Sequence, residues 1–267
     1  MCLIVFAHQV DSDHPLLVAA NRDEFYARPT TPSQFWPQHP DVLAGRDGLA
    51  GGTWMGVTRQ GRFTAITNYR DPAATQPKPR SRGLLTLDYL TGDKSPEAFI
   101  KQLEGATGDF ADFNLLLGDG KDLWYFASIA GNQTSQRLEP GIYGLSNAEL
   151  NTPWPKVNLG KAQLQQLIDS REAITHDSLM ATISDHESAD SAALKQLNLD
   201  SGMDQLLSAQ FICAGTYGTR SCTTLFTEAD GQIHWREQYF NEQGATFGER
   251  CYSFATTTHQ PARRISA

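Results

Sequence analysis

A cysteine at position 2 directly follows the initiator methionine and begins a short apolar run. The cell's methionine aminopeptidase removes Met1 when the second residue is small, and cysteine is small enough. Removal would leave Cys2 with a thiol of ordinary pKa about 8.5 and a free α-amine of pKa about 7.7–8.0. One residue would then hold both a nucleophile and a partly neutral base. The alternative is that Cys2 is a small apolar residue at the start of a buried strand.

A second group of candidates is the polar segment Asn21, Arg22, Asp23 and Glu24, which directly follows the apolar run at residues 16–20. Polar groups at the end of a core strand need partners or a ligand. Side chains alternate faces along a strand, so we expect Asn21 and Asp23 on one face and Arg22 and Glu24 on the other. An acid near an N-terminal amine would orient its ammonium form. A turn with a surface ion pair is the alternative.

Three further polar residues have chemistry suited to a site. Asn68 and Asn147 each end a strand-like run, and asparagine amides are natural donors to an oxyanion. Turns are the commoner use of asparagine, so that alternative stays open. Arg220 lies in the glycine-containing segment 215–221, whose backbone would let it bind a carboxylate or phosphate. Its alternative is a solvated arginine on a flexible loop.

Composition excludes several classes of partner. The formal net charge of -8 gives no electrostatic reason to bind nucleic acid or an anionic membrane surface. The N-terminus has no basic segment before its apolar run, and no stretch is long enough to span a membrane. We therefore expect a cytoplasmic protein without membrane insertion.

The cysteines, histidines and glycines show no cofactor pattern. No CxxC pair, HExxH, GxGxxG or P-loop occurs, so we expect no metal and no other cofactor. Besides Cys2, we expect Cys213, Cys222 and Cys251 to be buried apolar residues in a reducing compartment.

The order of local patterns predicts the fold class. Strand-like runs predict hairpins at residues 3–20 and 52–68, and a proline-containing irregular loop is expected at 25–40. Ser95 before Pro96 predicts a helix start, and further helices are expected at 154–168 and 177–183. More strands are expected at 113–129, at 141–145 and after 208, with a hairpin turn at Asp230-Gly231. These patterns predict a single α+β domain over residues 1–267, with antiparallel sheets and segregated helices.

Eight short motifs occur in order along most of the chain: MCLIVFA at 1–7, NRDEF at 21–25, AGRDGLAGGTWMGV at 44–57, TNYR at 67–70, SRG at 81–83, GLSNA at 144–148, TPWPKV at 152–157 and YGTRSCT at 217–223. Together they resemble the NRDE family, also named the transport and Golgi organisation 2 family. That family is similar to N-terminal-nucleophile hydrolases. The resemblance implies a four-layer αββα sandwich with two stacked antiparallel sheets.

The resemblance also implies roles for site residues. In the cysteine branch of those hydrolases the nucleophile opens the first strand, as Cys2 does, and an Asn-x-Asp pair ends the next strand, as Asn21 and Asp23 do. An arginine often precedes that Asn, but Ala20 stands there. The usual partner of the thiolate is therefore absent, or it is supplied by Arg22 or Arg220. Oxyanion donors are expected where Asn68 and Asn147 stand.

The leading functional hypothesis is hydrolysis of a linear, non-peptide amide C–N bond in a small molecule. Cys2 would attack the carbonyl after Met1 removal and form a thioester, with Asp23 orienting the amine. Substrate contacts are expected from Arg22, Arg220, Trp54 and Tyr69, with Arg220 binding an acidic group. Whether the chain is an enzyme at all stays open.

Two non-enzymatic hypotheses remain. Eukaryotic members of the family are associated with Golgi organisation, lipid metabolism and haem trafficking, so the chain could carry a hydrophobic ligand such as haem or a lipid. Cys2 or His8 would then be an iron ligand, and the aromatic residues expected to line the pocket are Trp36, Trp54, Tyr69, Trp154 and Tyr217. A scaffold or interaction protein is neither supported nor excluded.

Overall fold

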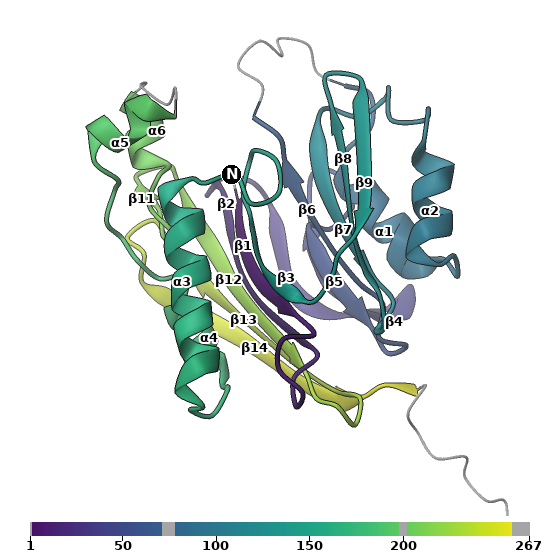
Figure 1. Cartoon of the computed structure of the whole chain (residues 1–267). Coiled ribbons are helices and arrows are strands. Elements are labelled where there is room, and N and C mark those ends of the chain that lie inside the picture. Colours follow the sequence, from purple (N-terminus) through teal and green to yellow (C-terminus); the bar gives the residue numbers. More distant parts are fainter. Residues whose placement is uncertain (1, 71–77, 198–201, 258–267) are drawn as a thin grey trace, which may run out of the picture.

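Two antiparallel β-sheets stack face to face at the centre of the protein (Figure 1). The computed structural model describes residues 2–70, 78–197 and 202–257. In this part of the chain each sheet has seven strands. The first sheet contains β1 (Cys2–His8), β2 (Leu16–Phe25), β10 (Gly141–Leu145), β11 (Cys213–Ala214), β12 (Tyr217–Thr227), β13 (Gln232–Phe240) and β14 (Thr246–Ala255). Its strand order is β10-β1-β2-β12-β13-β14, and β11 pairs with β12.

The second sheet runs in simple chain order from β3 to β9. Its strands are β3 (Thr30–Trp36), β4 (His39–Asp47), β5 (Met55–Thr58), β6 (Phe63–Asn68), β7 (Phe113–Gly118), β8 (Leu123–Ile129) and β9 (Asn132–Arg137). The helices of the described residues are α1 (Gly83–Thr91), α2 (Pro96–Leu103), α3 (Pro155–Ser170), α4 (His176–Ala181), α5 (Ser191–Gln196) and α6 (Gly202–Leu206).

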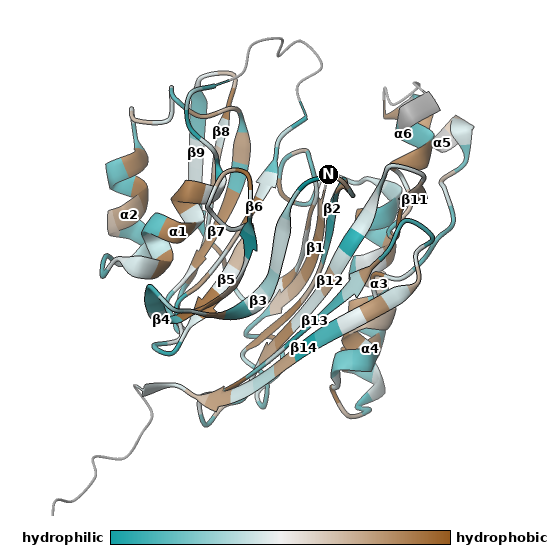
Figure 2. Ribbon diagram, turned by 180° about the vertical axis from the view of Figure 1, so that it is seen from behind, coloured by the Kyte–Doolittle hydropathy of each residue, from teal (hydrophilic) through white to brown (hydrophobic). Residues whose placement is uncertain are grey.

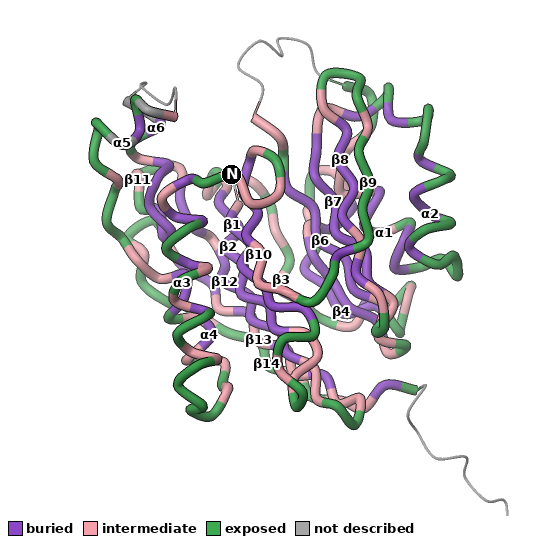
Figure 3. Tube along the Cα trace, in the orientation of Figure 1, coloured by how far each residue is buried: buried purple, intermediate pink, exposed green. Residues whose placement is uncertain are grey.

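Three layers of apolar side chains hold the sheets and helices together. Between the sheets, Ile4 and Phe6 of β1 share a core with Met55 and Leu116 of the second sheet. The opposite face of β1 and β2 packs on α3 and α4, and the outer face of the second sheet packs on α1 and α2. Hydrophobic residues accordingly run along the strands (Figure 2), and the buried backbone lies mainly in the sheets (Figure 3). The expected four-layer αββα sandwich is confirmed.

Most of the expected elements are present. The hairpin β1–β2 pairs Cys2 with Arg22 and His8 with Leu16. Helix α2 begins as expected, because the Ser95 side chain accepts a hydrogen bond from the Ala98 backbone N–H and Pro96 occupies the first turn. Strands β12 and β13 flank the turn at Asp230-Gly231.

Two sequence-based expectations are wrong. The expected irregular loop at 25–40 contains β3 and the start of β4. Strand β3 lies at the edge of its sheet, and its pairing with β4 is irregular between Thr31 and Gln34, so Pro32 removes no hydrogen bond that a regular central strand would need. Of the three cysteines expected to be buried, only Cys222 is buried, whereas Cys213 and Cys251 are exposed.

Among the described residues, none of the helices is long and apolar enough to cross a membrane.

A partly buried contact between α4 and β12 is expected to make the stability of the protein depend on pH. His176 Nδ1 lies 2.8 Å from Thr224 Oγ1, and its ring centroid lies 5.0 Å from that of Phe226. Burial lowers the pKa of His176 to about 4 from an ordinary value of 6.5. Between these two values the unfolded chain binds a proton that the folded chain does not, so the free energy of unfolding falls as pH falls through this window.

We expect His176→Gln, which keeps a hydrogen-bonding side chain without a proton to gain, to lose less stability on acidification. Urea midpoints at about pH 7 and about pH 5 measure this difference. Equal losses in the variant and the unmodified protein would contradict the prediction.

Candidate active site

Strand pairing places Cys2 on the face of the first sheet that looks toward the second. Cys2 and Arg22 lie opposite each other in the β1–β2 ladder, and they share the face of Ile4, which packs between the sheets. Asn21 and Asp23 have the other face, which the helices cover. The expected alternation of Asn21 and Asp23 against Arg22 is therefore confirmed.

Cys2 is anchored by residues that follow β10 and end β6. The Cys2 backbone nitrogen donates to Asn147 Oδ1 over 3.2 Å, and Ser146 Oγ donates to the Cys2 carbonyl over 2.7 Å. Asn147 Nδ2 in turn donates to the Asn68 carbonyl over 2.6 Å. Asn147 thus joins the start of the first sheet to the second sheet at the position of Cys2.

Burial controls the charge of the thiol and of the acid beside it. Cys2 is half-buried, and burial raises the pKa of its thiol above the ordinary value, while a hydrogen bond from the Asp23 backbone opposes the rise. Asp23 is 2% exposed, and burial raises its pKa. Thr219 Oγ1 donates to Asp23 Oδ1 over 2.7 Å. A protonated thiol at neutral pH would need a base before it could attack.

A buried lysine completes the charges at this end of β1 and β2. Lys156, in the first turn of α3, is only 1% exposed. Burial lowers its pKa, and the negative charges of Asp23 and of ionised Cys2 oppose that lowering. Its positive charge likewise counters the effect of burial on the pKa of Asp23. Lys156 was not singled out as a site residue from the sequence, although it lies within the TPWPKV motif.

Asn21 connects β2 to the helical layer. Its Nδ2 donates to the carbonyls of Ile183 over 2.7 Å and Gln210 over 2.9 Å, so both amide protons are used. This geometry holds the β2 strand next to Cys2 in place.

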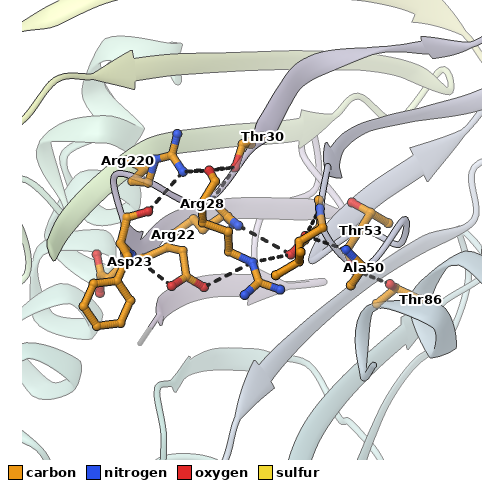
Figure 4. A network of polar contacts seen from close by, with 12 residues as sticks. Arg22, Asp23, Arg28, Thr30, Ala50, Thr53, Thr86 and Arg220 are labelled. Atoms are coloured by element: carbon orange, nitrogen blue, oxygen red, sulfur yellow. Dashed lines mark hydrogen bonds and ion pairs between the residues drawn. The ribbon is translucent and has the colours of Figure 1, made fainter. Parts of the chain in front are cut away.

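Arg22 and Arg28 form a polar network on the inter-sheet side (Figure 4). The Arg22 guanidinium lies 4.2 Å from the ring centroid of Trp54 and donates to Thr30 Oγ1 over 3.2 Å. Arg28 Nε donates to Asp47 Oδ2 over 2.7 Å, and Arg22 lies 3.8 Å from the same oxygen. Trp54 therefore supports Arg22 by stacking.

Arg220 holds the turn after β2. Its NH1 group donates to the carbonyls of Phe25 and Arg28 and to Thr30 Oγ1. In Figure 4 its guanidinium points toward Thr30. It does not line the cavity that contains Cys2, whereas Arg22 does.

Two cavities lie near Cys2 and its hydrogen-bond partner Asn147. The first, of about 150 Å³, is called the polar cavity and is lined by Cys2, Arg22, Asp23, Glu24, Arg28, Asp47, Thr53, Trp54, Ile66, Asn68, Ser81, Arg82 and Gly83. The second, of about 410 Å³, is called the apolar cavity and is lined by Phe25, Asn68, Tyr69, Arg70, Asn147, Leu206, Leu207, Ala214, Thr216 and Tyr217. Asn68 lines both, so the two cavities adjoin at the end of β6.

The aromatic residues expected to line a carrier pocket do not share one cavity. Tyr69 and Tyr217 line the apolar cavity, and Trp54 lines the polar one. Trp36 and Trp154 are buried in two different cores. His8 lines a separate cavity of about 330 Å³ at the far end of β1. Within the described ranges no group of three or more His, Cys, Asp or Glu is placed to hold a metal ion.

The comparisons with known proteins assign the family. The family model for Transport and Golgi organisation 2 matches residues 1–242. The Mus musculus Transport and Golgi organization 2 homolog is 32% identical over 257 residues, covering 89% of this chain and 92% of the relative. The Homo sapiens homolog is 32% identical over 275 residues, covering 95% of this chain and 99% of the relative. The chain belongs to the transport and Golgi organisation 2 family.

One of the similar solved structures is the Caenorhabditis elegans ortholog of N-acylethanolamine-hydrolyzing acid amidase. It is 11% identical to this chain, with a TM-score of 0.48. The match covers 84% of this chain and 92% of that chain.

Proposed function

We propose that the protein is a cysteine N-terminal-nucleophile amidohydrolase of the cytoplasm, which cleaves a linear, non-peptide amide in a small molecule. The observation that carries the proposal is the position of Cys2. Cys2 lines the polar cavity, and its backbone nitrogen donates to Asn147 Oδ1 over 3.2 Å. That nitrogen becomes an α-amine, next to the thiol, once Met1 is removed.

The first half of the reaction forms a thioester. The neutral α-amine takes the proton of the Cys2 thiol, and the resulting thiolate attacks the amide carbonyl carbon. The carbonyl oxygen becomes an oxyanion, and the C–N bond then breaks as the ammonium returns its proton to the leaving amine. In the second half the amine takes a proton from water, and the resulting hydroxide attacks the thioester carbonyl carbon. The C–S bond then breaks, the ammonium returns its proton to the Cys2 thiolate, and a carboxylic acid is released.

Asn68 and Asn147 are the proposed oxyanion donors. Asn68 lines both cavities, and no hydrogen bond of its side chain occurs within the described residues, so its amide protons are available to a ligand. Asn147 uses one amide proton on the Asn68 carbonyl and has a second one. Its Oδ1 also accepts from the Cys2 nitrogen, so Asn147 positions the base as well.

Asp23 and the cavity residues have supporting roles in the proposal. Asp23 is a buried acid whose charge acts on Cys2, and it would stabilise the protonated α-amine while the thiolate attacks. Arg22, supported by Trp54, lines the polar cavity, and Tyr69 lines the apolar one. Arg220 would act indirectly, through the turn that carries Arg28.

The experiment that tests the proposal compares two forms of the N-terminus. One is produced without a tag, and the other keeps a short extension before Cys2. Each is treated with a thiol-acylating probe and analysed by intact mass and peptide mapping. We expect loss of Met1 from the first form and acylation of its Cys2 about 100-fold faster than in the extended form, because only the first has the base.

The exposed thiols Cys213 and Cys251 provide the internal control, since their labelling rates should be equal in both forms. Retention of Met1, or equal rates at Cys2 in the two forms, would contradict the proposal. Either outcome would favour the carrier hypothesis and direct the next measurement to haem and lipid titrations.

A further inference from the structure

Arg82 differs from the other arginines of the polar cavity in its partners. Arg28 lies 2.7 Å from Asp47, and Arg22 is stacked on Trp54 and lies 3.8 Å from Asp47. Arg82 makes no ion pair with any carboxylate of the described residues, and its NH1 group donates to the Asp112 carbonyl over 2.9 Å. Its guanidinium is thus anchored by a neutral group and keeps donors and charge for another partner.

The position of Arg82 relates it to the nucleophile. It lines the polar cavity with Cys2, and it immediately precedes α1, which packs against the second sheet. Burial lowers the pKa of Arg82, and ionised Cys2 is the charge that most opposes this effect. A half-buried guanidinium without a carboxylate partner, next to a reactive group, is suited to bind an anion.

The apolar cavity reaches the same group of residues through Asn68 and Asn147. Leu206 and Leu207 line it together with Tyr69 and Tyr217. Phe25 also lines it, although 57% of its surface is exposed, and its ring packs edge-on against Tyr217 with centroids 5.1 Å apart. A volume of about 410 Å³ is in the range of small-molecule sites, and apolar walls favour apolar groups.

The junction between the cavities coincides with the catalytic groups. Cys2 opens into the polar cavity and Asn147 into the apolar one, and the two residues are hydrogen-bonded to each other. Asn68 borders both. An amide bond placed here would have one substituent in each cavity.

We propose, on the basis of the function inferred above, that the substrate is an amide joining an apolar group, bound in the apolar cavity, to a carboxylate- or phosphate-bearing group, bound by Arg82. Arg82 then determines specificity for the anion, while Cys2 carries out the chemistry. Arg22 and Arg28 frame the anion site but direct their charge toward Asp47.

The test separates binding from catalysis by using Cys2→Ala protein and calorimetric titration. The ligands are N-dodecanoylglycine and its uncharged counterpart N-dodecanoylglycinamide, which differ only in the carboxylate. N-dodecanoyl-O-phosphoethanolamine replaces the carboxylate by phosphate, and N-dodecylsuccinamic acid reverses the amide. We expect at least one of the three anionic ligands to bind at least about 10-fold more tightly than the uncharged glycinamide.

Arg82→Gln in the same Cys2→Ala background should abolish that preference, because the side chain keeps donors but loses the charge. Arg82→Lys should keep part of it, because the charge remains without the planar fork. Arg46, an exposed arginine on β4 that lies outside both cavities, provides the charge-matched control, and Arg46→Gln should leave the preference unchanged. Circular dichroism establishes that each variant is folded, and Arg82→Lys decides the question if Arg82→Gln does not fold.

Two results would overturn the inference: every anionic ligand binding no more tightly than the glycinamide, or an anion preference that survives when Arg82 is replaced. The proposed function is tested separately, by measuring turnover of the same compounds with protein that keeps Cys2. A preference in binding without any turnover would overturn the amidohydrolase and leave the anion site standing. Turnover without an anion preference would overturn the anion site and leave the amidohydrolase standing.

Discussion

Replacing Cys2 with alanine is expected to lower hydrolysis of any amide that the protein cleaves by at least about 1,000-fold. Alanine at position 2 is also small enough for Met1 removal, so the variant would keep the proposed α-amine at the nitrogen that hydrogen-bonds to Asn147. The substitution therefore removes only the thiol. Without it the proposed thioester cannot form, and what remains is the rate that the proposed oxyanion donors and substrate binding supply.

The fold should tolerate this change. Cys2 is half-buried at the very start of β1, and the apolar residues that anchor this strand are Leu3–Ala7. Cys251→Ala, at an exposed thiol of β14, is the matched control and should keep full activity. Turnover of a responsive amide is measured for both variants, with melting temperature recorded alongside. If Cys2→Ala hydrolyses the amide as fast as the unmodified protein, the nucleophile is not Cys2.

The sequence predicted those elements whose signals are local. The apolar runs of β1 and β2 are unbroken because each strand is buried on both faces, and the polar loop between them indicated their hairpin. Apolar runs did not predict β9. Its six residues are almost all exposed at an edge of the second sheet, so the strand has no apolar pattern. Helix α1 begins without a side-chain cap at Arg82, so the usual start signal was missing.

The site was predictable to the extent that its residues lie on those strands. Cys2, Asn21 and Asp23 lie on the paired strands β1 and β2, whereas Asn68 and Asn147 were expected as oxyanion donors from asparagine chemistry and from the family resemblance. The structure brings Asn147 to the nitrogen of Cys2 and to the carbonyl of Asn68. These contacts depend on how the two sheets stack, which no local pattern encodes.

The charged groups around the thiol show the limit of sequence reasoning most clearly. The usual arginine partner of the thiolate was expected to be absent or to be supplied by Arg22 or Arg220, and of these two only Arg22 lines the polar cavity. The cations that burial brings close to Cys2 also include Arg82 and Lys156. A lysine near the start of an amphipathic helix normally extends into solvent, and only the packing of α3 on the first sheet turns Lys156 inward.

The second large effect concerns this buried lysine, because Lys156→Met is expected to lower the free energy of unfolding by about 3–5 kcal/mol. Methionine fills similar space, so the main loss is the positive charge that opposes the burial of Asp23. The carboxylate would then be left in a low-dielectric site without its buried cation. Urea unfolding measures the loss, and Lys161→Met is the matched control. Lys161, one turn further along α3, donates to Asn151 Oδ1 over 2.8 Å. Its replacement by methionine should lower the free energy of unfolding by about 1 kcal/mol or less.

A double variant and a pH series identify charge as the cause. Lys156→Met combined with Asp23→Asn should recover most of the lost stability, because neither partner is then charged. In Lys156→Met alone, the pKa of Asp23 should rise further above its unfolded value, so the folded chain would bind a proton that the unfolded chain does not. The variant should therefore lose stability as pH rises through that window and approach the unmodified protein in acid. If the double variant is as unstable as Lys156→Met and the loss of stability is the same at every pH, Lys156 contributes to stability through packing, and the charge state of Asp23 does not depend on it.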